Sequence, residues 1–321
     1  MSGRLARDDE VTAWRDEGWV VLDGLIGADE IDAVSADLGE VFPAPSAYHG
    51  DPAAARERWL GHPPASHDVF VWPPDGPGFR PEQHRWSAQF PFPGGGMLNR
   101  LCVHPALVDF AERALDTADL RLYQATVSGR YAGDANYEQP MHTDRNHSWL
   151  PAGSETPWWQ LQMFVYLSDV HPGNAPTHVV PLADSQGRAT TVWGVMPSQD
   201  PALYAAERPA AGPRGSVLAY RSNVFHRGVD LTEAGASRFM MGVCFKTAGQ
   251  DWIGFNVNPS VSTSLEWVSF AEGSTPRELA LFGFPPPGHP IWDDALLDET
   301  ATLYPKLDLE PWRAALRNRQ R

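Results

Sequence analysis

The sequence predicts a single mainly-β domain in which short strands form a sandwich or a closed roll, flanked by helices and long loops. Between about residues 120 and 247, apolar residues recur at every second position in short runs bounded by Gly, Pro, Asn or Asp. Proline accounts for 30 of the 321 residues, roughly twice the ~5% average, and it disfavours long helices and central strands. No internal repeat or low-complexity linker divides the chain, so we expect one domain over residues 1–321.

Five runs rich in β-branched and aromatic residues are the expected core strands: 121–128, 161–168, 176–181, 216–221 and 238–246. Helices are expected on both sides of this region. They span 8–17, with an acidic first turn, 28–41, 105–115, with proline in its first turn, and 310–319. A short strand is expected at 19–22, between the first two helices.

Two long segments lack any sustained period. They are residues 42–98 and 252–290, both rich in aromatic residues and proline. Aromatic side chains are scarce in disordered chains, and long structureless loops in a compact domain are usually functional. We therefore expect both segments to be ordered and to cover the core, and they are the best candidates for a lid.

Composition excludes several classes of function. The net charge is −15, and no basic cluster offers a footprint for nucleic acid or for an anionic membrane. Cys102 and Cys244 are the only cysteines, too few for a disulfide framework or a Cys-type zinc site. The first residues lack the apolar stretch of a signal peptide, and no run approaches the ~18 apolar residues of a membrane span. We expect a cytoplasmic protein with a small-molecule substrate; its oligomeric state is left open.

Three residues form a candidate metal site. His142 and Asp144 lie two positions apart, so in a strand both side chains project from one face and can reach one ion. His226, which follows an apolar strand and a polar turn, is the best third ligand. Two imidazoles and one carboxylate on one face of an octahedron leave three positions open, as in the facial triad of non-haem iron(II) oxygenases. A structural zinc site would instead be closed by four ligands.

Arg238 extends this hypothesis. It begins the run 238–246, whose two faces are both largely apolar, so the strand is expected to be buried with Arg238 drawn inward. A buried guanidinium needs an anion. The far carboxylate of a dicarboxylate co-substrate would provide one through a bidentate contact. Arg238 could also be an ordinary ion-pair partner, for example of Asp230 or Glu233.

These residues and their surroundings resemble the phytanoyl-CoA dioxygenase superfamily of Fe(II)/2-oxoglutarate-dependent oxygenases, which includes ectoine hydroxylase. Residues 17–25 (EGWVVLDGL) stand where the family has its Asp-Gly-Phe/Tyr-Val-Val-Leu stretch, and 101–107 (LCVHPAL) resembles its Leu-x-x-x-Pro-x-Leu helix start. His142-Thr143-Asp144 matches the His-x-Asp motif, and His226 with Arg238 resembles the distal His and Arg. The resemblance covers about residues 14–247.

The resemblance implies a double-stranded β-helix core, the cupin-like jelly roll. It also implies an Fe(II) centre, and 2-oxoglutarate and O2 as co-substrates that yield succinate and CO2. A carboxylate at Asp144 favours hydroxylation, because halogenating relatives lack it. A polar residue that helps to seat 2-oxoglutarate is expected at Gln124 or Ser128. Nothing in the chain indicates a site for a CoA nucleotide, so the substrate stays open.

Two other readings remain: a metal-dependent cupin enzyme that does not use 2-oxoglutarate, and a jelly-roll binding protein without turnover. Trp149, Trp158 and Trp159 follow the His-x-Asp motif and could wall a substrate pocket or simply pack. We expect His147 to lie outside the metal's ligand set and Arg145 to be solvated.

Overall fold

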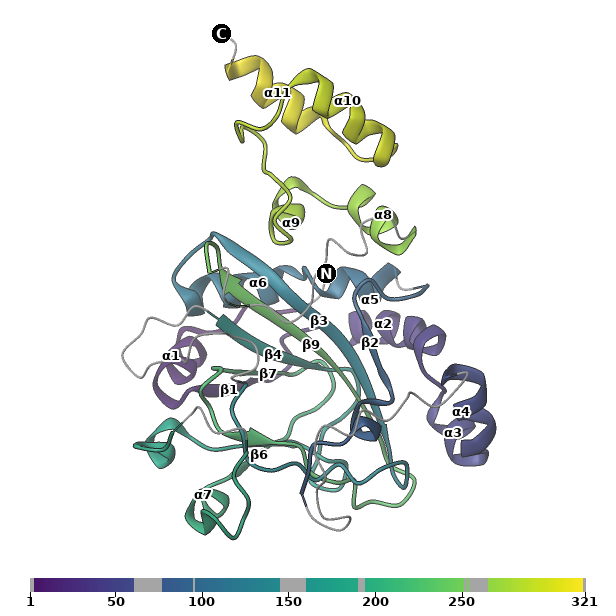
Figure 1. Ribbon diagram of the computed structural model, residues 1–321, viewed down its shortest axis with the longest axis vertical. Coiled ribbons are helices and arrows are strands. Elements are labelled where there is room, and N and C mark those ends of the chain that lie inside the picture. Colours follow the sequence, from purple (N-terminus) through teal and green to yellow (C-terminus); the bar gives the residue numbers. More distant parts are fainter. Residues whose placement is uncertain are drawn as a thin grey trace.

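Two antiparallel sheets form the centre of the molecule (Figure 1). The structure, a computed structural model, describes residues 3–60, 77–94, 96–144, 160–189, 194–250, 253 and 265–319. The large sheet has the order β1-β7-β4-β9-β3-β2. Its strands are β1 (Trp19–Leu22), β2 (Ser87–Gln89), β3 (Leu120–Tyr131), β4 (Gln160–Tyr166), β7 (Val217–Tyr220) and β9 (Ser237–Thr247). The small sheet has the order β6-β5-β8, from β5 (Thr177–Val179), β6 (Arg208–Ala210) and β8 (His226–Arg227).

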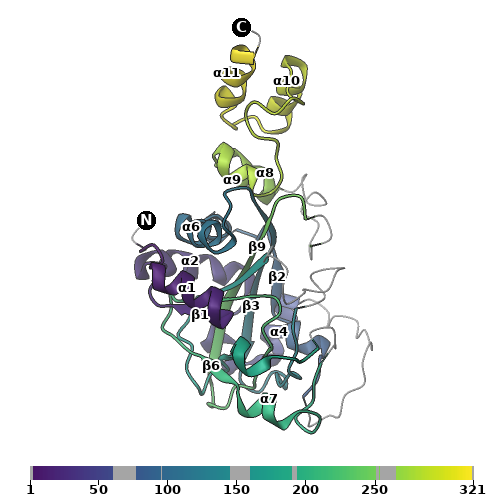
Figure 2. The ribbon, with the colours of Figure 1, turned by 90° about the vertical axis from the view of Figure 1, so that its left-hand side faces the viewer.

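Helices cover the outer face of the large sheet. Figure 2 shows α1, α2 and α6 on one side of its strands. The helices before β3 are α1 (Asp8–Glu17), α2 (Ala28–Val41), α3 (Pro45–Gly50), α4 (Pro52–Leu60), the 3-10 turn η1 (Pro81–His84), α5 (Gly96–Leu101) and α6 (Pro105–Leu115). Those after β5 are η3 (Leu182–Ser185), α7 (Pro201–Ala205), α8 (Leu265–Glu272), α9 (Pro276–Ala280), α10 (Asp294–Leu303) and α11 (Glu310–Arg319).

The two faces of β9 show how the sheet divides the molecule. Phe239, Met241, Val243 and Phe245 point outward into the main hydrophobic core beneath the helices. The alternate residues, including Met240 and Cys244, point inward. Met240 packs there with side chains that include Val179 of the small sheet. The small sheet therefore lies over the inner face of the large one, and the space between the sheets holds the candidate site.

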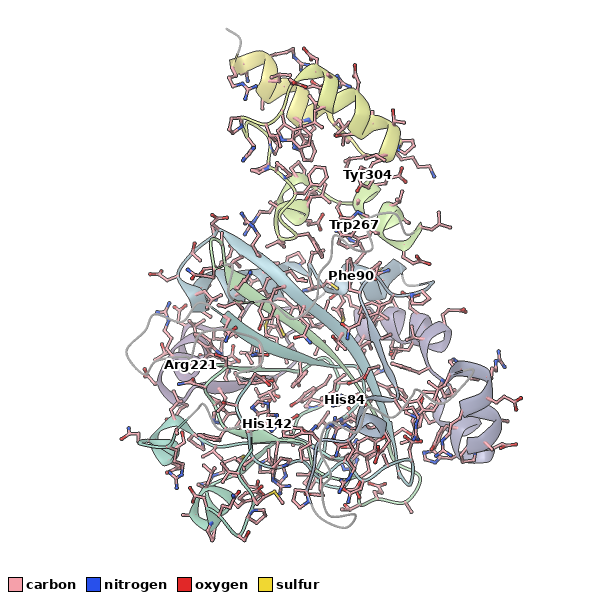
Figure 3. The ribbon with its side chains drawn as sticks, viewed as in Figure 1. His84, Phe90, His142, Arg221, Trp267 and Tyr304 are labelled. Atoms are coloured by element: carbon pink, nitrogen blue, oxygen red, sulfur yellow. The ribbon has the colours of Figure 1, made fainter. Side chains whose placement is uncertain are left out.

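The C-terminal helices extend beyond the end of β3 and β9 (Figure 1). Phe90 stacks on Phe282 and makes edge contacts with Trp267 and Phe270, which joins α8 and α9 to the chain beside β2. Trp267 Nε1 donates a hydrogen bond to the Tyr304 hydroxyl at 2.9 Å. Figure 3 shows Phe90, Trp267 and Tyr304 in succession from the sheet toward α10. Aromatic contacts thus connect this extension to the core.

The observed elements agree with the sequence expectations where local signals are strong. The helices predicted at 8–17, 28–41, 105–115 and 310–319 have these bounds in the structure, and each predicted core strand overlaps an observed one. Within the described residues the chain has more helix than predicted, because α3, α4 and the start of α5 lie in segment 42–98 and α8 and α9 in segment 252–290. None of the described helices is long and apolar enough to span a membrane.

Candidate metal centre and its pocket

His142, Asp144 and His226 come together in the structure. Each offers one nitrogen or oxygen atom within 4.8 Å of those of the other two. Reciprocal backbone hydrogen bonds hold the histidines side by side: His142 N donates to His226 O at 2.9 Å, and His226 N donates to His142 O at 2.8 Å. The segment with His142 thus continues the small sheet beyond β8. Two sequence-distant imidazoles are brought to one point by a single backbone pairing.

The two imidazole rings are oriented by the backbone. His142 Nδ1 lies 2.8 Å from the carbonyl oxygen of Pro140, and His226 Nδ1 lies 3.0 Å from that of Val224. A carbonyl can only accept, so Nδ1 is the protonated nitrogen in each ring. The lone pair is then on Nε2, the arrangement usually found for metal-binding histidines. Both rings present a ligand atom without further rearrangement.

Asp144 is buried and held by two neighbours. Its Oδ2 accepts a 2.9 Å hydrogen bond from the Tyr220 hydroxyl, and its Oδ1 lies 3.5 Å from His226 Nε2. Burial, together with the charge of Asp144, raises the pKa of Tyr220 well above its ordinary value. The hydroxyl therefore stays protonated and donates. Burial alone would lower the pKa of His226, but Asp144 more than offsets this effect and the pKa is raised.

The three residues border a cavity of about 510 Å³ between the sheets. Phe79, Gln83, Ser87 and Gln89, from segment 42–98, also line it. Phe79 makes an edge contact with the His142 ring, with centroids 4.9 Å apart. From the strands that follow, the lining residues are Gln124, Thr126, Ser128, Arg130, Gln162, Phe164, Thr177, Tyr220, Arg238, Met240, Gly242 and Cys244.

Strand register arranges these side chains in rows across the sheet. One row, here called the Gln162 row, consists of Tyr220, Gln162, Cys244 and Gln124 on β7, β4, β9 and β3. A β-bulge between Leu122 and Gln124 turns Gln124 toward this face. Because Tyr220 belongs to the row and bonds Asp144, the Gln162 row lies beside the candidate metal centre.

Two arginines mark a different row. Arg238 on β9 pairs in register with Arg130 on β3, and both line the cavity. We call them the arginine pair. The exposed fraction of Arg238 is only 2%, its Nη1 donates to the Ala175 carbonyl, and its Nε has no partner among the described residues. Burial lowers the pKa of Arg238 well below its ordinary value, and the charge of Arg130 lowers it further.

Arg130 is held in place without a salt bridge. Its Nη1 donates to the Val229 carbonyl at 3.3 Å, and its guanidinium lies 4.7 Å from the centre of the Tyr137 ring. A Cβ on Gly228 would lie 3.0 Å from Arg130 Nη2 and 2.9 Å from Gln139 Oε1, so a larger residue there would have to displace these side-chain ends. Among the described residues neither arginine is ion-paired with a carboxylate, Asp230 and Glu233 included. Arg238 is buried and Arg130 half-buried, so the pair is a largely buried positive centre without a carboxylate partner among the described residues.

The structure places the other expected residues as follows. Gln124 lies in the Gln162 row, whereas Ser128 pairs in register with Met240, one row from the arginine pair. Trp149, Trp158, Trp159, Arg145 and His147 lie outside the described residues. Within segment 252–290, Ile253 packs against Tyr123 and Cys244 beneath the cavity.

Two residues that belong to this centre were missed in the sequence. Arg130 carries the signal that identified Arg238, a charge in a buried strand, but only the register places the two side by side. Tyr220 stands in an apolar run with no pattern to distinguish it from a core tyrosine. Its role appears only through its contact with Asp144.

Comparison with known proteins yields matches among solved structures. No protein-family model matches the chain, and no curated protein matches it by sequence. One similar structure is SnoK, a non-heme alpha ketoglutarate dependent carbocyclase from nogalamycin biosynthesis; identity is 17%, coverage is 76% of this chain and 85% of SnoK, and the TM-score is 0.51.

Two further structures carry bound molecules. The epimerase SnoN, in complex with Fe3+, alpha ketoglutarate and nogalamycin RO, has 16% identity, covers 75% of this chain and 83% of its own, and has a TM-score of 0.51. EctD from S. alaskensis, with 2-oxoglutarate and 5-hydroxyectoine, has 18% identity, covers 78% of this chain and 80% of its own, and has a TM-score of 0.51. The chain therefore has the fold of these iron and 2-oxoglutarate-dependent enzymes, in agreement with the resemblance seen in the sequence.

Proposed function

We propose that this protein is an Fe(II)- and 2-oxoglutarate-dependent oxygenase that hydroxylates an unactivated C–H bond of a small molecule and releases succinate and CO2. One observation carries the proposal. A His-Asp-His cluster and a pair of arginines without a carboxylate partner among the described residues border the same buried cavity. The cluster matches an open iron site, and the arginine pair matches the far end of a dicarboxylate.

The donor set fits iron. His142 and His226 present Nε2, and Asp144 presents an oxygen, with no thiolate in the cluster. Two imidazoles and one carboxylate suit Fe(II) and leave positions for a bidentate 2-oxo acid and for dioxygen. When bound, the iron would supply the redox chemistry of oxygen activation. Tyr220 would hold the orientation of the Asp144 carboxylate.

The arginine pair fits the co-substrate. A carboxylate placed between Arg238 and Arg130 would receive charge-assisted hydrogen bonds and neutralise two buried cations. The 2-oxo acid end of the same molecule would bind at His142, Asp144 and His226, which line the same cavity. A metal enzyme that does not use 2-oxoglutarate would have no need for this pair. The arginines would therefore select a dicarboxylate over a simple 2-oxo acid.

The finer fold assignment is part of the proposal. The core strands of the large sheet run β3-β9-β4-β7, and the small sheet runs from the His142 segment through β8 and β5 to β6. Successive strands alternate between the two sheets for most of this region, as a double-stranded β-helix requires. The roll brings His226 and Arg238 to facing sheets around one cavity. Its interior, lined by Phe79, Phe164 and Tyr220, would exclude water from the reacting groups.

The test is anaerobic absorption spectroscopy of purified protein with Fe(II) and 2-oxoglutarate. We expect a metal-to-ligand charge-transfer band that requires both additions. His142→Ala should abolish the band, whereas Arg238→Ala should retain the metal and require much more 2-oxoglutarate. Exposed His289, replaced by alanine, is the matched control and should leave the band unchanged. An unchanged band in the His142→Ala protein contradicts the assignment.

A further inference from the structure

We infer that the substrate presents an uncharged carbonyl, hydroxyl or ether oxygen to the side-chain amide of Gln162. This inference rests on the proposed function and names the chemistry of its substrate. The group that carries it, Gln162 Nε2, belongs neither to the metal cluster nor to the arginine pair. It lies in the cavity beside the candidate metal centre.

Gln162 is buried with an unused donor. The exposed fraction of its side chain is 2%, and its Nε2 has no hydrogen-bond partner among the described residues. Its Oε1 accepts from the Cys244 thiol at 3.6 Å. That contact directs the oxygen toward β9 and leaves the NH2 group to the cavity. Buried polar groups in native proteins are almost always hydrogen-bonded, and the exceptions commonly mark a ligand or a solvent site.

The surroundings of Gln162 are polar but uncharged. Cys244 also lies 3.4 Å from Gln124 Oε1, and Gln124 Nε2 donates to the Thr126 hydroxyl at 3.4 Å. Thr126 in turn donates to Gln89 Oε1 at 2.9 Å. These neighbouring groups hold one another in place. The neighbouring side chains are thus hydrogen-bonded to one another, whereas Gln162 Nε2 remains a donor without a partner among the described residues.

The charges of the cavity lie elsewhere. Among the described lining residues the arginine pair are the only Lys or Arg side chains, and Asp144 is the only carboxylate. Arg130 lies six residues from Gln124 along β3, in a different row of the register. Among the described lining residues, none of the side chains of the Gln162 row is charged, and an ammonium group there would meet the Gln162 donor. An uncharged acceptor oxygen satisfies Gln162 Nε2 without a charged partner.

The position of Gln162 relative to the candidate metal centre indicates what a contact between Gln162 and the substrate would do. Gln162 pairs in register with Tyr220, whose hydroxyl bonds Asp144. An oxygen held by Gln162 would therefore hold the substrate beside the metal cluster, in a different row from the arginine pair. Gln124, expected from the sequence to help seat 2-oxoglutarate, is here assigned to the substrate side.

The experiment compares three probes that share one ring: cyclohexanecarboxamide, cyclohexanecarboxylate and cyclohexylmethylammonium. Binding is measured by ligand-observed NMR on the full chain with 2-oxoglutarate and with diamagnetic Zn(II) in place of Fe(II). The wild type should prefer the carboxamide. Gln162→Glu should lower carboxamide affinity about tenfold, the loss of one donated hydrogen bond, and raise affinity for the ammonium probe. Gln160→Glu, two residues earlier on the same strand face but outside the cavity lining, is the control and should change neither.

Titration of 2-oxoglutarate on the same samples separates the two proposals. If the wild type does not bind 2-oxoglutarate, the proposed function fails. If 2-oxoglutarate binds but the wild type prefers a charged probe, the inference about the substrate is overturned. It is equally overturned if Gln162→Glu retains 2-oxoglutarate and keeps the wild-type preference. The wild-type comparison decides the question even if the variant does not fold.

Discussion

The candidate metal site, here called the cluster, consists of His142, Asp144 and His226. It lies in one cavity with the arginine pair, but the two are held in place differently. At the metal cluster, His142 and His226 are oriented by carbonyls, and Asp144 is held by Tyr220. At the arginine pair, two cations face the cavity with no carboxylate among the described residues to neutralise them. The cluster is organised in the ligand-free fold, whereas under the proposed function the pair gains its anion only when 2-oxoglutarate binds.

This difference predicts opposite effects on stability. Residues around the cluster contribute contacts that exist in the ligand-free fold, so their loss should weaken it. The arginine pair costs free energy in the ligand-free protein, because the charges lose hydration and gain only carbonyl and aromatic partners, with no carboxylate among the described residues. The four predictions below test that contrast, from the largest expected effect to the smallest.

Removal of a metal ligand should have the largest effect. His226→Ala takes away one of three ligand atoms, and even the loss of a residue that only supports a ligand typically costs 10–100-fold in affinity. We expect Fe(II) affinity to fall by more than about a hundredfold, measured by competition with a chelator of known affinity. His289→Ala should leave it unchanged. A His226→Ala protein that competes as well as the wild type would remove this residue from the site.

Arg238→Met should affect binding and stability in opposite directions. The flexible apolar side chain fills similar space without a charge, so the ligand-free protein should become more stable by about 1–3 kcal/mol. At the same time 2-oxoglutarate should no longer raise the unfolding midpoint of the metal-loaded protein. Urea unfolding with and without 2-oxoglutarate measures both. Loss of stability in the ligand-free variant would show that the guanidinium is already compensated.

Tyr220→Phe removes one hydrogen bond to Asp144 and little else. The ring can keep its packing, while Asp144 Oδ2 loses its 2.9 Å donor. We expect Fe(II) affinity to fall about tenfold, less than for a lost ligand, because only the orientation of the carboxylate is loosened. Affinity for 2-oxoglutarate at saturating metal should change little. A larger effect on the affinity for 2-oxoglutarate than on the affinity for Fe(II) would assign Tyr220 to co-substrate binding instead of to the orientation of Asp144.

Glu207 allows a smaller test, in the small sheet that carries His226. Burial tends to raise its pKa, but hydrogen bonds from Arg227 and His178 outweigh burial and lower it to about 2. Because the pKa of Glu207 is lower in the folded than in the unfolded protein, its carboxylate contributes to the free energy of unfolding. This stabilisation is fully present above the unfolded-state pKa near 4.5 and disappears as the pH falls from there toward 2. Glu207→Gln should cost about 1–2 kcal/mol at pH 7 and lose less stability on acidification. Urea unfolding across this pH range is the measurement, and parallel curves for the two proteins would contradict it.

Sequence signals were sufficient where structure is determined locally. Helix α6 begins at Pro105, after an N-cap at His104, and ends at Leu115, before a C-cap at Asp116, and its bounds were predicted. The two-residue strand β8, by contrast, is defined only by pairing with β5 and with the His142 segment. Short helices such as α3 lack the several turns over which a helical period becomes visible.

The candidate site shows the same division. His142, Asp144 and His226 could be proposed from residue type and spacing, and Arg238 from a charge in an apolar strand. Arg130 could not, because its significance depends on its register with Arg238, 108 residues later in the sequence. The Gln162 row is likewise a property of four paired strands. Long-range pairing, rather than any local pattern, determines these neighbours.

The central claim is that the metal cluster and Arg238 hold the two ends of one dicarboxylate. The most direct test compares 2-oxoglutarate with 2-oxobutyrate, which lacks the far carboxylate, in wild type and Arg238→Met loaded anaerobically with Fe(II). Dissociation constants come from the charge-transfer band. The wild type should bind 2-oxoglutarate about a hundredfold more tightly, and the variant should bind both with similar, weak affinity. A preference for 2-oxoglutarate that survives Arg238→Met would contradict the account.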